Sequence, residues 1–158
     1  MAILRISADQ KNKRIIGFRA WHRGLRQMVH VRSCNFDIAD EQAEIITPFS
    51  QTTSIAQMKE LVLLQDTNSY AADGRHVYEG DIIVVELENQ FGSFERCIGE
   101  VAFDEVIWGY NVKLFSGSGL PLTGRINVLD IIGNVFQGID ESKQKEYGEQ
   151  KRIQGGKK

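Results

Sequence analysis

Two carboxylates, Glu79 and Asp81, flank Gly80 and are the residues of this sequence best placed to do chemistry. Paired carboxylates at this spacing could bind a divalent cation or act as a general acid and base. The competing interpretation is structural, because a carboxylate at a tight turn accepts hydrogen bonds from backbone N–H groups and fixes the corner. We favour the structural interpretation and predict a structural turn built from Gly74, Tyr78, Glu79, Gly80 and Asp81.

The other residues that could bind a metal or attack a substrate are scattered. His22, His30 and His76 fall in different predicted elements, and Cys34 and Cys97 lie far apart, so none has the spacing of zinc ligands. The sequence also lacks a glycine-rich phosphate loop that runs into Lys-Ser/Thr, and it lacks a G-x-S-x-G nucleophile elbow. We therefore predict that both cysteines are free thiols. We also predict that the protein has no catalytic residues, binds no metal and no cofactor, and is not an enzyme.

Basic and aromatic residues interleave near the N-terminus, in a pattern that could contact nucleic acid. Residues 1–32 hold eight basic residues and one acid, whereas residues 33–110 hold three basic residues and fifteen acids. Such a segment could bind phosphates, and its rings could stack on bases. The candidate contacts are Arg14, Phe18, Arg19, Trp21, Arg23 and Arg26. The alternative, which we favour, is that these charges offset the acidic part of the fold.

Turn signals and short apolar runs predict the strands that would position these residues. Residues 14–32 alternate around Arg23-Gly24 and predict a β-hairpin. Asp73-Gly74 predicts a turn, and the β-branched run Ile82–Val85 predicts a strand that is covered on both faces. We expect a further strand over residues 107–115 and a short helix over residues 55–60.

These elements predict one mainly β domain, α+β at most, with a single short helix. In this arrangement a hairpin region, 14–60, packs on a small SH3-like β-barrel formed by residues 61–138. Residues 1–13 form an N-terminal arm, and residues 139–158, which are polar and charged, form a flexible tail. No apolar run approaches the roughly 18 residues of a membrane span, so we expect no membrane association.

Four segments resemble the YopX family of phage and prophage proteins. They are I-G-F-R-A-W at residues 16–21, L-L-Q-D-T-N-S at 63–69, D-G-R-H-V-Y-E-G-D-I-I at 73–83 and I-I-G-N-V-F at 131–136. The third segment is the most specific, and the likeness covers about residues 14–137. The resemblance implies a mainly β fold with an SH3-like barrel, a phage genome and the cytoplasm of the host cell. It brings no established activity and no catalytic residues.

Three hypotheses about function follow from these observations. The first is a non-enzymatic phage accessory protein that binds a protein partner, possibly a second copy of itself, because small β domains expose strand edges that can pair with another chain. The alternative is a nucleic-acid-binding protein that uses the basic N-terminal hairpin. An enzyme that uses Glu79 and Asp81 is the third and least favoured hypothesis.

Overall fold

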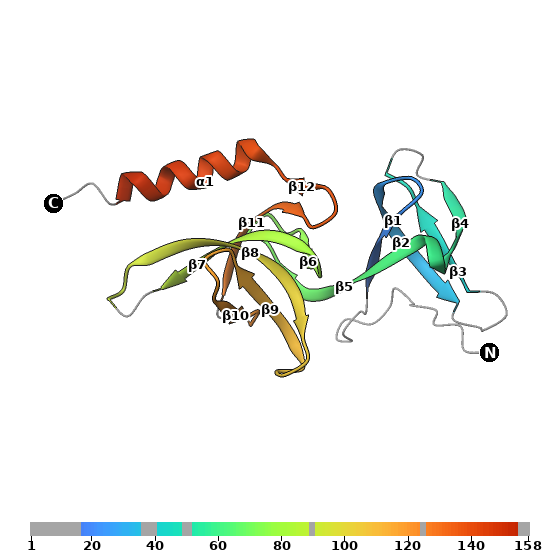
Figure 1. Ribbon diagram of the computed structural model, residues 1–158, viewed down its shortest axis with the longest axis horizontal. Helices are drawn as coiled ribbons and strands as arrows, with labels where there is room; N and C mark the ends of the chain where they lie inside the picture. The colour runs from blue at the N-terminus through green and yellow to red at the C-terminus, as the bar shows by residue number, and fades with distance from the viewer. Residues whose placement is uncertain (1–16, 36–40, 49–51, 89–90, 124–125, 155–158) are drawn as a thin grey trace. The chain divides into compact units, whose positions relative to one another are not determined.

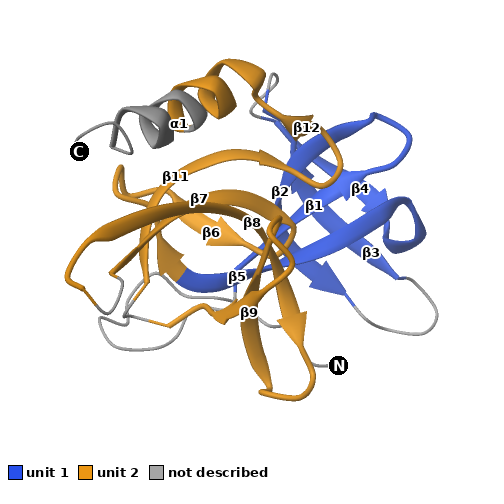
Figure 2. Ribbon diagram, turned by 60° about the vertical axis from the view of Figure 1, so that its left-hand side comes forward, with its two compact units in different colours: residues 1–68 blue, residues 69–158 orange. Residues whose placement is uncertain are grey.

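The computed structural model describes residues 17–35, 41–48, 52–88, 91–123 and 126–154, so Arg14 and the predicted arm at residues 1–13 lie outside the described residues. The chain forms two compact units, residues 1–68 and residues 69–158 (Figures 1 and 2). Twelve strands make up two six-stranded antiparallel sheets, which confirms the prediction of a mainly β protein.

The first unit is a meander of strands. It comprises β1 (Phe18–His22), β2 (Gln27–Asn35), β3 (Gln42–Ile46), β4 (Thr53–Gln57), the one-turn 3-10 helix η1 (Met58–Glu60) and the start of β5 (Leu61–Tyr70). β1 and β2 form the predicted hairpin, with Phe18 opposite Val31. β5 then returns along the chain to pair with the other side of β1. Alternate residues of all five strands point to one apolar core, which includes Ala20, Val29 and Ile45.

The second unit contains the remaining elements. They are β6 (His76–Tyr78), β7 (Asp81–Glu88), β8 (Phe94–Asp104), β9 (Gly109–Leu114), β10 (Gly119–Pro121), β11 (Asn127–Asn134), β12 (Gly138–Ile139) and helix α1 (Glu141–Gln154). The second sheet has the order β10-β9-β8-β7-β11-β12, and the first has the order β4-β3-β2-β1-β5-β6.

β7 is the central strand of the second unit and is buried on both faces, as its sequence predicted. Ile83 and Val85 point into the larger core of this unit, together with Val77, Val101 and Val112. Ile82 and Val84 point to the opposite face, where they pack with Ile132, Ile98 and Tyr147 of α1. The run of β-branched residues therefore serves two apolar layers at once.

Four expectations differ from the structure. No closed barrel is detected over the described part of residues 61–138, because the second sheet is open and its edge strands β10 and β12 are only three and two residues long. The boundary between the compact units falls at residue 68, inside β5, rather than at residue 60. Residues 55–60 form the end of β4 and η1 in place of an α-helix. Residues 141–154 form helix α1 where we expected a flexible tail.

No helix in the described parts of the chain is long and apolar enough to cross a membrane. Both cysteines are free thiols, as predicted.

Candidate protein-binding site

The turn between β6 and β7 contains the carboxylates that first suggested chemistry. Asp81 is fully buried, and its Oδ2 accepts a hydrogen bond of 2.8 Å from the backbone N–H of Tyr78. Gly80 has a φ of 79°, donates its N–H to Val101 and accepts the N–H of Val135 through its carbonyl oxygen. The Asp81 carboxylate and the Gly80 backbone thus fix the corner from inside, which supports a structural role.

Glu79 is half-buried beside this corner, and Gly74 occupies the preceding turn with a φ of 85°. No group of three or more His, Cys, Asp or Glu residues among those described is arranged to hold a metal ion.

A second polar network joins the predicted turn to α1. Asp130 of β11 forms a 2.9 Å ion pair with Lys143 and a shorter ion pair with Arg75, which also bonds Asp73 at 2.6 Å. The Tyr147 hydroxyl lies 3.5 Å from the Asp130 carboxylate. Burial opposes ionisation of Asp130, but the Lys143 ammonium and the Arg75 guanidinium outweigh it and hold the pKa of this carboxyl below its ordinary value. The network fastens α1 to the sheet.

The candidate nucleic-acid contacts do not share one surface. Phe18 points to the core of the first unit, on the same side of β1 as Ala20. Arg19 and Trp21 alternate with them and lie on the opposite face of the strand. Arg23 and Arg26 are exposed in the β1–β2 turn.

Two of the most exposed apolar residues of the second unit, Val106 and Trp108, lie at the tip of the β8–β9 hairpin. Figure 1 shows the path of this hairpin. This tip, residues 105–108, joins Asp104 to Gly109, which are paired across the two strands. Val106 is 90% exposed, Trp108 is 84% exposed, and Ile107 between them is 47% exposed. Three consecutive apolar side chains at the end of a hairpin contribute little to either core, so burial within this chain does not explain them.

The tip is held in a defined conformation. Asp104 accepts the backbone N–H of Val106 at 2.8 Å through Oδ1 and the side-chain amide of Asn111 at 3.2 Å through Oδ2. These two hydrogen bonds hold the pKa of the Asp104 carboxyl below its usual range, and the bond from Val106 has the larger effect. Just below the tip, the rings of Phe103 and Tyr110 meet edge to face with centroids 5.7 Å apart.

Trp108 has a φ of 49°, in the left-handed region. A bulky residue is rare there, because its Cβ crowds the backbone, and strained residues cluster at recognition and catalytic sites. The hairpin therefore presents a large aromatic side chain to solvent from a strained and hydrogen-bonded turn.

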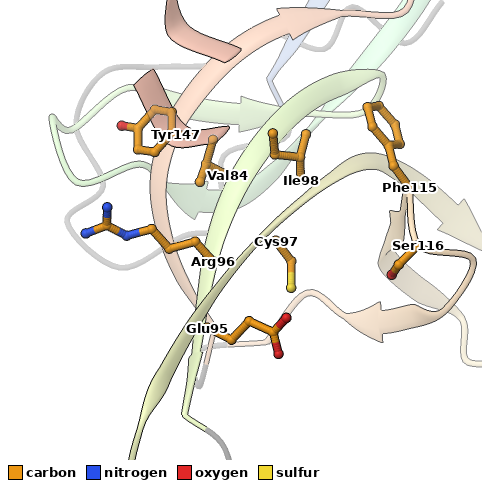
Figure 3. Close-up of a pocket in the computed structure, with 8 residues that line it drawn as sticks. All are labelled: Val84, Glu95, Arg96, Cys97, Ile98, Phe115, Ser116 and Tyr147. Atoms are coloured by element: carbon orange, nitrogen blue, oxygen red, sulfur yellow. The ribbon is translucent and has the colours of Figure 1, made fainter. Parts of the chain in front are cut away.

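A shallow groove lies on the side of the second sheet that faces α1 (Figure 3). It has a volume of about 260 Å³. Val84 and Ile98 lie beside Tyr147 and Phe115, and Arg96 lies at one end, whereas Cys97 points away (Figure 3). Arg96 is paired with Glu86 at 3.5 Å. The lining also includes the polar side chains of Glu95 and Ser116 (Figure 3).

The hairpin tip was not predicted from the sequence. The pattern of residues 107–115 predicted a strand that includes Ile107 and Trp108, whereas in the structure β9 begins at Gly109. The available signal was Asp104, since an Asp at the first position of a turn bonds the N–H two residues later.

Comparisons with known proteins identify relatives but no activity. The sequence model of the family described as "YopX protein" matches residues 17–138. Among solved structures, the chain is similar to protein EF1440 from Enterococcus faecalis, with 20% sequence identity and a TM-score of 0.49 over 82% of this chain and 97% of that one. No curated protein matches this chain.

Proposed function

This chain belongs to the YopX family, and we propose that it is a non-enzymatic protein-binding module that contacts its partner through the β8–β9 hairpin tip. The family resemblance supports a phage or prophage origin and a role as an accessory protein in the host cytoplasm.

The observation that carries the proposal is the exposed Trp108 in its left-handed conformation. Aromatic residues, Trp above all, dominate the energetics of protein interfaces when they fill a pocket of the partner. A turn already fixed by Asp104 loses little conformational entropy when it binds. Val106 and Ile107 add exposed apolar surface to the same tip, which suits a concave apolar pocket.

The charges around the tip restrict the chemistry of the partner. Asp104 and Glu105 are the only charged residues between Phe103 and Val112. An apolar tip with an acidic base complements a pocket with a basic rim and is repelled by phosphates and by anionic lipid. We therefore favour a protein partner over a nucleic acid or a membrane at this site.

Nucleic-acid binding is retained as an alternative at a different place, because Arg23 and Arg26 are exposed in the β1–β2 turn. Binding through them would weaken steeply with rising salt concentration, since phosphate contacts release counterions. Binding through the tip would respond to salt much less, because most of its contacts are apolar.

Capture of the partner from cells that carry the phage tests the proposal. A photo-crosslinking amino acid at Val106 should give a specific adduct with a host or phage protein. Trp108→Gly should abolish that adduct, whereas Phe91→Ala, which removes a ring that is 82% exposed elsewhere in the same unit, should leave it intact. An adduct that survives Trp108→Gly, or one that is lost equally in both variants, would contradict the proposal.

A further inference from the structure

A different surface, in the first unit, has a strand edge with no partner strand among the described residues. β4 is the terminal strand of the first sheet (Figure 1), and among the described strands it pairs with β3 alone. The edge of a sheet exposes unpaired N–H and C=O groups, which can bind another strand. β4 is five residues long, whereas the edge strands of the second sheet have three and two.

The composition of β4 does nothing to block such pairing. Its sequence, T-S-I-A-Q, contains no charged residue and no proline, which are the residues that natural edge strands use against unwanted association. Ala56 points to the core of the unit and is buried. Ile55 points the other way and is 58% exposed.

The register shows which backbone groups face outward. The N–H of Met58 donates to the carbonyl oxygen of Glu41 at 2.9 Å, on the β3 side. Because backbone direction alternates along a strand, Ser54 and Ala56 also direct their N–H and C=O groups at β3. Thr53 and Ile55 therefore direct theirs away from the sheet.

Gln57 follows the same alternation and faces outward. Its N–H is covered by the Glu60 carboxylate at 3.3 Å. The acidic side chain thus closes one end of the edge, and the available backbone groups centre on Ile55.

We propose that β4 pairs antiparallel with β4 of a second copy of this chain, about a two-fold axis at Ile55. In this register the N–H and C=O of Ile55 exchange two hydrogen bonds with Ile55 of the partner subunit, and the two exposed side chains meet on one face. Thr53 lies opposite Gln57 of the partner subunit, and Ser54 lies opposite Ala56. A two-fold interface is self-complementary, and an uncharged strand meets no like charge when it pairs with itself. The first sheet of one copy and the first sheet of the other then form one continuous sheet across the dimer.

Hydrogen exchange followed by NMR, at protein concentrations from about 10 µM to 1 mM, tests the register directly. The amide of Ala56, which faces β3, should be protected at every concentration. The amide of Ile55 should exchange rapidly in dilute solution and gain at least about tenfold protection as the dimer forms. Sedimentation velocity over the same range should show a monomer–dimer equilibrium.

Three variants separate the pairing from general effects on folding. Ile55→Pro removes an outward N–H without removing a bond to β3, and Ile55→Lys places like charges opposite each other, so both should weaken the dimer by at least about tenfold. Leu25→Lys makes the same charge change at a site that is 52% exposed in the β1–β2 turn and should leave the dimer unchanged.

If the Ile55→Pro variant fails to fold, the Ile55→Lys variant tests the pairing of β4 instead. A monomer at the highest concentration, a dimer that survives Ile55→Lys, or a strand from another protein bound to β4 of a monomeric chain would each overturn the proposal.

Discussion

Replacing Trp108 with glycine should remove partner binding and leave the fold as stable as before. Large aromatic residues usually stabilise a protein, so this expectation runs against the common effect of Trp→Gly substitutions, which cost several kcal/mol in a core. It follows from two structural features of Trp108, an exposed fraction of 84% and a φ of 49°.

The magnitude comes from three opposing contributions. A Trp residue offers roughly 250 Å² of surface, so an exposed fraction of 84% leaves about 40 Å² buried, which is about 1 kcal/mol at 25 cal/mol/Å². Release of the left-handed strain returns about 1–2 kcal/mol, because glycine has no Cβ. The greater freedom of glycine in the unfolded chain costs about 0.5–1 kcal/mol. The sum lies within about 1 kcal/mol of zero.

Trp108→Ala is the matched control, because alanine loses the same ring but keeps the Cβ that causes the strain. Urea denaturation should therefore find the alanine variant about 1 kcal/mol less stable than the glycine variant, although glycine is normally the poorer residue next to a strand. An alanine variant as stable as the glycine one would show that the left-handed backbone at this position carries little strain. A glycine variant that loses more than about 2 kcal/mol would show that the ring holds the hairpin together. Trp108 would then be a structural residue.

Four further changes should alter the stability of the second unit, as measured by thermal or urea unfolding. Gly133→Ala should cost roughly 3 kcal/mol or more, because a Cβ there would lie 2.1 Å from the carbonyl oxygen of Gly138. This oxygen belongs to the backbone and cannot move aside as a flexible side chain could. Gly74→Ala should cost only about 1 kcal/mol, since its φ is 85° but nothing lies within 4 Å; equal losses for the two glycines would contradict the reasoning. Asp81→Ala should cost about 1–3 kcal/mol by leaving the backbone N–H of Tyr78 without its acceptor, and an unchanged melting temperature would refute the role of Asp81 at the corner. Asp130→Asn should lower stability at pH 7, and the difference should shrink as the pH falls below the ordinary value near 4 and through the lowered folded-state pKa, because the stabilisation is lost as the folded carboxyl is protonated; a difference that does not shrink in acid would argue against the ion pairs.

The sequence was informative where local chemistry alone decides the structure. The run Ile82–Val85 has enough β-branched residues to require a strand with two covered faces, and Asp73-Gly74 and Gly80-Asp81 define tight turns within a few residues of it. The β1–β2 hairpin was predictable for the same reason, since its alternation and its turn lie within one short segment.

Pairing with other strands decides some elements that local patterns describe poorly. Ile55, Met58 and Leu61 have helical spacing, but pairing with β3 makes Thr53–Gln57 a strand, and so short a segment fits either period. Residues 66–69 carry turn-forming side chains, yet β5 continues through them, and the N–H of Asp66 donates to the carbonyl oxygen of Gly17. Gly17 is far from Asp66 in sequence, whereas β3 directly precedes β4 along the chain.

Helix α1 shows the same limit. Its segment is polar enough to predict a flexible tail, but Asp140 accepts the N–H of Ser142 at its start, and Lys143 and Tyr147 reach Asp130 on β11. The cap is a local signal that the sequence contains. The anchor on Asp130 is a long-range contact that the composition of the tail does not reveal.

The hairpin tip was missed because apolar residues are normally evidence of burial. Val106, Ile107 and Trp108 fit the start of a strand, and only Asp104 indicates that the chain turns first. The same carboxylate then limits what the tip can bind. Its hydrogen bonds lower the pKa of this carboxyl, so at neutral pH the turn that presents Trp108 carries a negative charge at its base. A surface that is apolar at its end and acidic at its base favours a basic-rimmed protein pocket over phosphate or anionic lipid, and this selectivity follows from the residue that builds the turn.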